Sequence, residues 1–207
     1  MKVKVTPSKV HGNIKIPASK SMAHRALICA SLSDGTSLVS NVTSSKDIEA
    51  TVGCMKALGA KIKQIDETTY EVTGTNLFKQ EGNITCSANE SGSTLRFLIP
   101  LAACTNAKVK FLGQGRLLQR PMDVYENEFK KQNIEFNQSD KEIIVSGNLK
   151  AKDYVVQGDI SSQFITGFMF VLPLLDQDST LTITEPYESK SYVNLTIQML
   201  AKFGIEI

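Results

Sequence analysis

The sequence predicts an α+β protein made of three repeated βαβαββ units, the last of them incomplete. Three segments share a polar, Ser-rich start followed by a long apolar helix pattern. They are SKSMAHRALICASL from Ser19, ESGSTLRFLIPLAAC from Glu90 and SSQFITGFMFVLPLL from Ser161. Their starts lie 71 residues apart in both steps (90 − 19 and 161 − 90). Recurrence at a fixed period indicates a repeat architecture, in which each unit is one supersecondary structure.

Strand candidates follow each of these first helices and also close each complete unit. The strands after the helices are expected at 36–42, 107–113 and 179–185. The stretches 60–74 and 134–147 place strand-like residues on both sides of a polar turn, as β-hairpins do. Together with two helices, each complete unit is therefore predicted to be β-α-β-α-β-β in cyclic order.

A second helix is expected in each unit, between its first strand and its hairpin. In the first unit Ile48, Val52 and Met55 recur at helical spacing, which places them on one face. Ser44, with Asp47 three residues later, resembles the capping box found at helix starts. The second helices of the other two units show a similar apolar spacing.

The second helices end in the same way in all three units. Gly59, Asn133 and Gly204 occupy the same position, just after the last apolar helical residue. Glycine and asparagine tolerate the left-handed backbone conformation that often closes a helix. The sequence therefore predicts a left-handed residue at each of these three positions.

Two segments lie outside the complete repeats. Residues 1–17 match no part of the repeat and are expected to form a short β-hairpin that turns at residues 11–13. In the third unit the sequence reaches 203–207, FGIEI, where the first hairpin strand is expected to begin. We therefore expect the chain to end within a repeat and to leave a strand edge without its usual neighbour.

The composition excludes several classes of function. The 207 residues are 42% hydrophobic and 21% charged, with 23 basic and 21 acidic side chains and a net charge of +2. So small a charge does not favour binding to nucleic acid or to a membrane. Four cysteines without metal-type spacing are expected to be buried, reduced thiols of a cytoplasmic protein. His11 and His24 are the only histidines, too few for a His-based metal site.

The starts of the three first helices are candidate anion sites, because a helix N-terminus presents unpaired N–H groups and a partial positive charge. Lys20, Arg25 and Arg96 lie on these helices, and Arg116 and Arg120 follow the second unit's first strand. Each hydroxyl taken alone is an ordinary N-cap. Their recurrence beside cationic groups predicts a ligand that carries phosphate and carboxylate groups.

Five segments in order resemble the hallmark motifs of the EPSP synthases, the 3-phosphoshikimate 1-carboxyvinyltransferases. They are PASKSMAHRAL (17–27), ESGSTLRF (90–97), GQGRLLQRPMD (113–123), GDISSQFITG (158–167) and ESKSYVNLT (188–196). The resemblance implies one domain of the enolpyruvyl transferase fold. Residues 18–207 are then a three-repeat substrate-binding domain that is truncated at its C-terminal end. Residues 1–17 would be strands that belong to the other, absent domain.

The resemblance also implies a reaction and a set of residues. The family transfers the enolpyruvyl group of phosphoenolpyruvate to the 5-hydroxyl of shikimate 3-phosphate and releases phosphate, with no metal or organic cofactor. Lys20 is the implied catalytic residue. The implied contacts of shikimate 3-phosphate are Lys20, Ser21, Arg25, Ser161, Ser162, Gln163, Ser189 and Tyr192. The implied contacts of phosphoenolpyruvate are Lys20, Gly92, Arg120 and Gln163.

The family's acid–base carboxylates lie in the half that we expect to be missing. The chain alone is therefore expected to bind substrate but not to turn over, with the absent C-terminal domain as its partner. One alternative is half of a UDP-N-acetylglucosamine enolpyruvyl transferase, although the loop 113–123 lacks the Cys usual there. The other is a non-catalytic domain that binds anions or RNA. It is disfavoured because no basic stripe is interleaved with aromatic residues.

Overall fold

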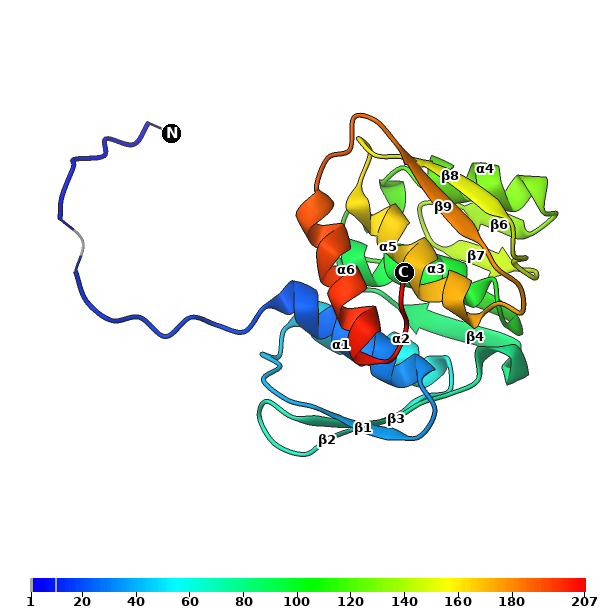
Figure 1. Cartoon of the computed structure of the whole chain (residues 1–207), viewed down its shortest axis with the longest axis horizontal. Coiled ribbons are helices and arrows are strands. Elements are labelled where there is room, and N and C mark those ends of the chain that lie inside the picture. The colour runs from blue at the N-terminus through cyan, green and yellow to red at the C-terminus, as the bar shows by residue number, and fades with distance from the viewer. Residues whose placement is uncertain (1, 10) are drawn as a thin grey trace.

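The computed structural model describes residues 2–9 and 11–207 and shows a mixed α and β architecture (Figure 1). The helices are α1 Lys20–Leu32, α2 Lys46–Ala57, α3 Gly92–Ala102, α4 Asp123–Lys131, α5 Ser162–Val171 and α6 Lys190–Lys202. The strands are β1 Thr36–Val39, β2 Lys61–Gln64, β3 Tyr70–Thr73, β4 Glu81–Ser87, β5 Asn106–Leu112, β6 Glu135–Gln138, β7 Ile143–Ser146, β8 Asp153–Gln157 and β9 Thr180–Thr184. Short 3-10 helices lie at η1 Leu77–Lys79, η2 Leu117–Gln119 and η3 Leu172–Leu174. None of the described helices is long and apolar enough to cross a membrane.

The strands form three small sheets, whose orders are β1-β3-β2, β4-β5-β7-β6 and β8-β9. In the second sheet β4 is parallel to β5, and β7 is antiparallel to β5 on its other side. The first sheet repeats the antiparallel part of this order, and the third sheet repeats the parallel part. The predicted α+β class and the order of elements in the repeat are confirmed.

Serine caps begin the first helices where the sequence predicted them. The hydroxyls of Ser19, Ser91 and Ser161 each accept a backbone N–H from the first turn of α1, α3 and α5. The predicted cap of α2 was wrong by one residue. Ser45, whose backbone is extended, accepts the N–H of Ile48, and the Ser44 hydroxyl bonds a glutamate of α2 instead.

The closing residues of the second helices are left-handed, as predicted. The φ angles of Gly59, Asn133 and Gly204 are 101°, 56° and 79°. Each lies two residues after the last residue of its helix, and in the first two units a hairpin strand follows. This agreement confirms that the three units share one backbone plan.

Buried hydroxyl groups join the helices of neighbouring units. The second helix of each unit carries one such group eight positions before its left-handed residue (59 − 51, 133 − 125 and 204 − 196). These groups belong to Thr51, Tyr125 and Thr196, all of them buried. Each group hydrogen-bonds the first helix of its own unit and the first helix of the next unit, so that the third unit bonds back to the first.

The individual bonds follow this cyclic order. The Thr51 hydroxyl bonds His24 on α1 and Thr94 on α3, each at 2.7 Å. The Tyr125 hydroxyl donates to the carbonyls of Arg96 on α3 and Phe164 on α5. The Thr196 hydroxyl bonds Arg25 on α1 at 2.8 Å and Thr166 on α5 at 3.0 Å. Because all these groups are buried, breaking a bond would leave polar atoms unsatisfied in the core.

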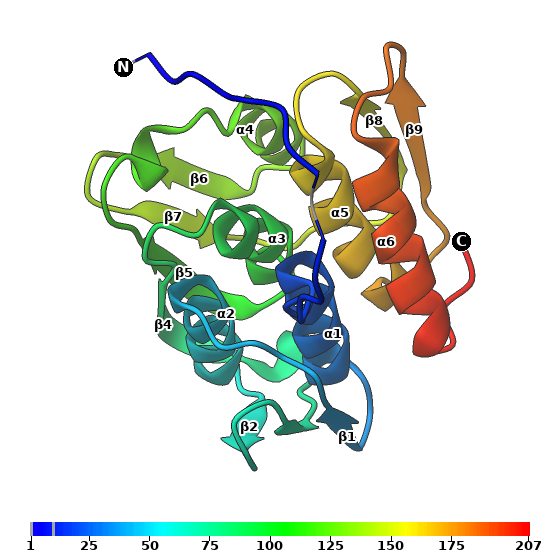
Figure 2. The ribbon, with the colours of Figure 1, turned by 90° about the vertical axis from the view of Figure 1, so that its left-hand side faces the viewer.

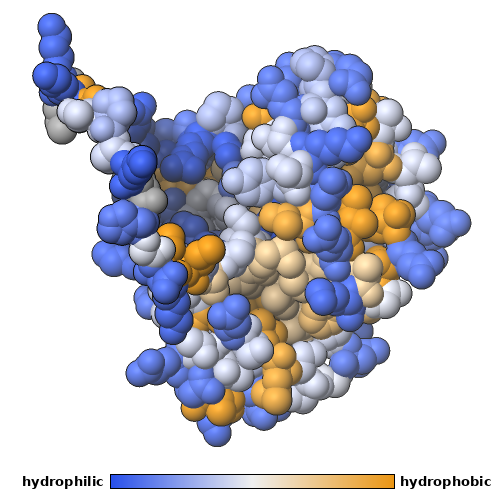
Figure 3. Space-filling model, turned by 60° about the vertical axis from the view of Figure 1, so that its left-hand side comes forward, coloured by the Kyte–Doolittle hydropathy of each residue, from blue (hydrophilic) through white to orange (hydrophobic). Residues whose placement is uncertain are grey.

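The N-terminal segment departs from the prediction. No strand forms within residues 2–9 or 11–18, so the expected hairpin is absent there, and Val10 lies outside the described residues. Its apolar side chains are exposed: Val3 by 69%, Val5 by 83%, Ile14 by 87% and Ile16 by 79%. Figures 1 and 3 show the segment standing away from the body. An alternating pattern gives a strand only where a sheet or core covers its apolar side.

Helices α3 and α5 approach closely at Gly167, which yields a first prediction. A methyl group there would lie 2.2 Å from the Tyr125 hydroxyl and 2.7 Å from the Arg96 carbonyl. We expect Gly167→Ala to lower the free energy of unfolding by about 1 to 3 kcal/mol, because overpacking forces these atoms apart. Urea denaturation measures the change.

The matched control is Gly53→Ala on α2. Gly53 is exposed, and a methyl group there meets nothing within 4 Å. Since alanine favours helix more than glycine does, this variant should be more stable by roughly 0.5 to 1 kcal/mol. Equal effects of the two substitutions would contradict the close helix contact.

Candidate functional site

The first helices lie side by side, and their starts carry many of the predicted site residues. Figure 2 shows α1, α3 and α5 in the middle of the fold, with α6 beside α1 and α5. The N-terminal segment joins the body at the start of α1, beside a hollowed and mostly hydrophilic part of the surface (Figure 3). The first turn of each helix has backbone N–H groups without a partner inside the helix, and these are available to a ligand at the helix start.

One cluster forms around Gly92 at the start of α3. A Cβ atom at Gly92 would lie 2.5 Å from Nη1 of Arg120 and 3.8 Å from Oε1 of Gln163. Nη1 of Arg96 donates to the same Gln163 oxygen at 2.8 Å, and the Gln163 amide nitrogen donates to Ser93 Oγ at 2.9 Å. We call these five residues the arginine cluster. It unites three of the four residues predicted to bind phosphoenolpyruvate.

The electrostatics of the arginine cluster favour a bound anion. Burial lowers the pKa of Arg96, and the nearby positive charge of Arg120 lowers it further. The buried Nε atom of Arg96 has no hydrogen-bond partner among the described residues, and its guanidinium lies over the Phe164 ring at 4.9 Å. Two like charges close together are stabilised by a phosphate or carboxylate between them.

A second cluster forms around Arg25, which is only 3% exposed. Its guanidinium donates to the carbonyls of Ser21 at 2.8 Å and Tyr192 at 3.0 Å. It also donates to the hydroxyls of Thr196 at 2.8 Å and Thr166 at 3.3 Å. Burial lowers its pKa to about 10. Arg25 therefore ties the start of α1 to α6, and it brings Ser21 and the half-exposed Tyr192 together.

Lys20 forms an ion pair that the sequence did not predict. Its Nζ atom lies 2.5 Å from the carboxylate of Asp47 in the first turn of α2. The side chains are 57% and 30% exposed, so the pair adds little to stability. The ion pair matters for the site because it places a carboxylate beside the predicted catalytic amine. The only sequence signal for Asp47 was its place near the start of a predicted helix.

The remaining predicted residues are serines at helix starts. Ser161 caps α5 by accepting the N–H of Gln163 at 3.3 Å. Ser162 is buried, and Ser189 precedes α6 with a left-handed φ of 54°. Within the described part of the chain, the hydroxyls of Ser162 and Ser189 make no hydrogen bond to another predicted site residue.

A buried chain of hydrogen bonds links α1 to the cap of α3. The Nδ1 atom of His24 bonds the Thr51 hydroxyl, which bonds Thr94, and the Thr94 hydroxyl donates to Ser91 Oγ at 2.7 Å. Ser91 in turn caps the helix that begins at Gly92. Burial lowers the pKa of His24 to about 4, so its ring is neutral in the folded protein at pH 7. These hydrogen bonds thereby fix the start of α3, where Gly92 of the arginine cluster lies.

Adjacent helix starts, two neighbouring guanidinium groups and a glycine packed against an arginine are typical of sites for small anionic molecules. The chain belongs to the EPSP synthase (3-phosphoshikimate 1-carboxyvinyltransferase) family, whose profile matches residues 5–207. This is a family of enzymes, and it confirms the resemblance drawn from the five motifs.

Individual relatives agree with this assignment. A 3-phosphoshikimate 1-carboxyvinyltransferase of Clostridium perfringens is 47% identical over 208 residues, which cover 100% of this chain and 49% of the relative. One from Clostridium kluyveri is 48% identical and is matched over 48% of its length. The solved EPSP synthase of Acinetobacter baumannii shares the fold, with a TM-score of 0.77 at 18% identity. The chain spans about half the length of the curated relatives it matches.

The buried imidazole of His24 predicts a pH dependence of stability. Its pKa falls from 6.5 to about 4 on folding, so the unfolded chain binds the proton more tightly between these values. We expect the free energy of unfolding to fall by about 2 to 3 kcal/mol from pH 6.5 to pH 4 because of this group. From about one pH unit above 6.5 its contribution is constant.

Urea denaturation at several pH values measures this effect. His24→Asn should remove that part of the slope, whereas His11→Asn, at an exposed position, should keep it. Carboxylates also titrate in this range, and comparing the two variants cancels their contribution. Identical slopes in the two variants would contradict a neutral, buried His24.

Proposed function

We propose that this chain binds shikimate 3-phosphate and phosphoenolpyruvate as one half of an enolpyruvyl transferase of the shikimate pathway. The observation that carries the proposal is the arginine cluster, in which Arg96, Arg120 and Gln163 surround Gly92. Family membership supports the same reaction, although the chain spans only half of its relatives. In this reaction the enolpyruvyl group moves to the 5-hydroxyl of shikimate 3-phosphate, and phosphate leaves.

Phosphoenolpyruvate is assigned to the arginine cluster. Its carboxylate and phosphate suit the guanidinium of Arg120, while Arg96 adds a second positive charge and holds Gln163 in place. The absence of a side chain on Gly92 leaves room for the ligand beside the N–H groups that start α3. Gln163 and Lys20 are assigned to the edge that this subsite shares with the second substrate. No metal or organic cofactor takes part.

Shikimate 3-phosphate is assigned to the starts of α1, α5 and α6. The residues proposed to contact it are Lys20, Ser21, Arg25, Ser161, Ser162, Gln163, Ser189 and Tyr192. Serine hydroxyls and helix N–H groups suit its phosphate and ring hydroxyls. The Arg25 guanidinium already serves four protein acceptors, so it would have to release a carbonyl to reach the ligand. A contact from Arg25 to the ligand phosphate therefore requires the guanidinium to exchange the Ser21 or Tyr192 carbonyl for a phosphate oxygen.

The chemistry passes through a tetrahedral adduct and requires proton transfers on both substrates, which positioned side chains supply. Lys20 is proposed as the catalytic residue of this half, and its ion pair with Asp47 orients the amine. These two groups do not make a complete acid–base set. The chain alone is therefore proposed to have negligible turnover, which an assay of phosphate release from phosphoenolpyruvate measures. We also propose a cytoplasmic location, which suits its four buried, unpaired cysteines.

A titration with shikimate 3-phosphate, followed by amide-resolved NMR at low salt, tests the substrate. We expect shifts that cluster at Ser21, at 161–163 and at Tyr192, because these groups surround the proposed subsite. UDP-N-acetylglucosamine and a short RNA serve as control ligands and should give no such cluster. If either control replaces shikimate 3-phosphate as the better ligand, the corresponding alternative function is correct instead.

The close approach of Arg120 to Gly92 predicts that a side chain at position 92 weakens the binding of phosphoenolpyruvate selectively. In Gly92→Ala the new methyl group displaces the end of the Arg120 side chain, which lies 2.5 Å from the site of the added atom. We expect the dissociation constant for phosphoenolpyruvate to rise about tenfold, or about 1.4 kcal/mol. That for shikimate 3-phosphate should stay constant. NMR titrations of Gly92→Ala and of the control Gly53→Ala measure both, and equal loss of both ligands would refute the assignment.

A further inference from the structure

The loop that carries Arg120 has little regular structure of its own. This segment, residues 113–122, runs from the end of β5 to the start of α4, and we call it the Arg120 loop. Its one helical turn is η2, where Leu117 and Leu118 are buried, whereas Arg120 is exposed. The guanidinium of Arg120 nevertheless lies beside Gly92 in the arginine cluster. The backbone of Arg120 therefore needs support from outside the loop.

The base of the Arg120 loop is tied to the segment before α3. The backbone N–H of Gln114 donates to the Asn89 carbonyl at 2.6 Å. The N–H of Ala88 donates to the Leu112 carbonyl at 2.8 Å, just before the loop begins. The loop therefore starts in a fixed place relative to the start of α3. These bonds reach only to Gln114, six residues before Arg120 (120 − 114), so they do not fix the backbone of the arginine itself.

The sequence around Arg120 takes its carbonyl out of the helical turn. The N–H of Arg120 closes η2 by donating to the Leu117 carbonyl at 3.2 Å. Because Pro121 follows, the helical conformation is disfavoured at Arg120, whose backbone is extended, with a φ of −71° and a ψ of 139°. A backbone carbonyl that leaves a helical turn in this way needs a partner from elsewhere in the fold.

Gln138, the last residue of β6, provides two hydrogen bonds to this part of the loop. Its Nε2 atom donates to the Leu118 carbonyl at 2.6 Å and to the Arg120 carbonyl at 2.9 Å. A primary amide has two N–H donors, so one side chain serves both acceptors. Gln138 is itself held in the hairpin of β6 and β7, where it pairs with Ile143 and where the Ser139 hydroxyl closes the turn. The amide therefore reaches the loop from a rigid support.

We propose that Gln138 is a positioning residue for Arg120. By holding the carbonyls of Leu118 and Arg120, its amide fixes the backbone from which the guanidinium reaches Gly92. The role rests on the proposed function, because it makes Gln138 a determinant of phosphoenolpyruvate binding. Gln138 acts only through the arginine, so its removal should weaken the binding of this substrate and leave the binding of shikimate 3-phosphate unaffected.

Backbone order parameters of the free chain, from ¹⁵N relaxation, test whether Gln138 holds the loop. Gln138→Leu removes both donors, and Gln138→Glu keeps the shape of the side chain but can only accept at neutral pH. In both variants we expect the order parameter of the Arg120 amide to fall from about 0.85 toward the flexible range below about 0.6. Wild-type order in both variants would overturn the proposal. Wild-type order in Gln138→Glu alone would also overturn it, because the side chain would then act by packing.

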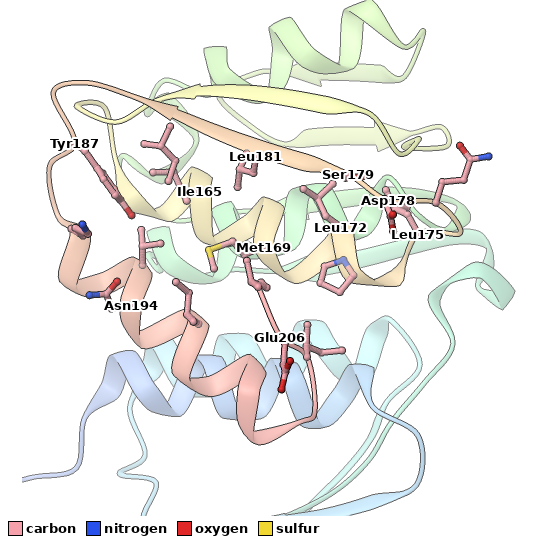
Figure 4. A pocket seen from close by; sticks show the side chains of 18 of the residues that line it. Ile165, Met169, Leu172, Leu175, Asp178, Ser179, Leu181, Tyr187, Asn194 and Glu206 are labelled. Carbon is pink, nitrogen blue, oxygen red and sulfur yellow. The ribbon is translucent and has the colours of Figure 1, made fainter.

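Two controls separate this local effect from a general loosening of the fold. Gln64→Leu changes the equivalent residue of the first unit, which ends β2 as Gln138 ends β6, and should leave the Arg120 amide unchanged. The Met169 amide is an internal reference, because Met169 of α5 lines an apolar groove against β9 and α6 (Figure 4). An equal fall in order at Met169 would contradict a role confined to the Arg120 loop.

NMR titrations with the two substrates test the consequence for binding. In Gln138→Leu we expect the dissociation constant for phosphoenolpyruvate to rise about threefold to tenfold, because two hydrogen bonds no longer hold the arginine. That for shikimate 3-phosphate should not change, and Gln64→Leu should keep both. An equal loss of both substrates, or an unchanged constant for phosphoenolpyruvate, would refute the role of Gln138. If the wild-type chain does not bind phosphoenolpyruvate, the proposed function fails, and the order parameters alone decide whether Gln138 holds Arg120.

Discussion

The fold depends on a cyclic set of buried hydrogen bonds that join the three units. Thr51, Tyr125 and Thr196 occupy equivalent places on the second helices, and each bonds two neighbouring first helices. Apolar packing alone would allow α1, α3 and α5 to slide along one another, because it has no direction. Directional bonds between buried groups specify one arrangement, since any slip would leave polar atoms unpaired.

The same bonds position the candidate site. The Thr51 hydroxyl leads through Thr94 to the cap of α3, and thus to the arginine cluster. Thr196 holds Arg25, which in turn fixes the carbonyls of Ser21 and Tyr192. Each candidate subsite is therefore attached to the interior by a continuous polar path. Rigid positioning of this kind is what binding of a charged ligand requires, because it lowers the cost of ordering the site.

The sequence predicted what repeats locally and missed what joins distant residues. The helix caps and the left-handed residues at 59, 133 and 204 depend on neighbours within one helix turn, and the period of 71 residues is visible because these local patterns recur. The four bonds of Arg25 reach as far as Thr196, 171 positions away, and no local pattern shows them. Asp47 was missed as the partner of Lys20 for the same reason. The N-terminal alternation predicted a hairpin, but no described sheet covers its apolar side.

Helix α5 carries two of these constraints at once. Its start carries Gln163, which bonds Arg96 in the arginine cluster. One turn further along, the Thr166 hydroxyl bonds Thr196 of α6, which also bonds Arg25 of α1. A shift of α5 would therefore disturb the arginine cluster and the bonds around Arg25 together, so the starts of the helices are positioned as one unit.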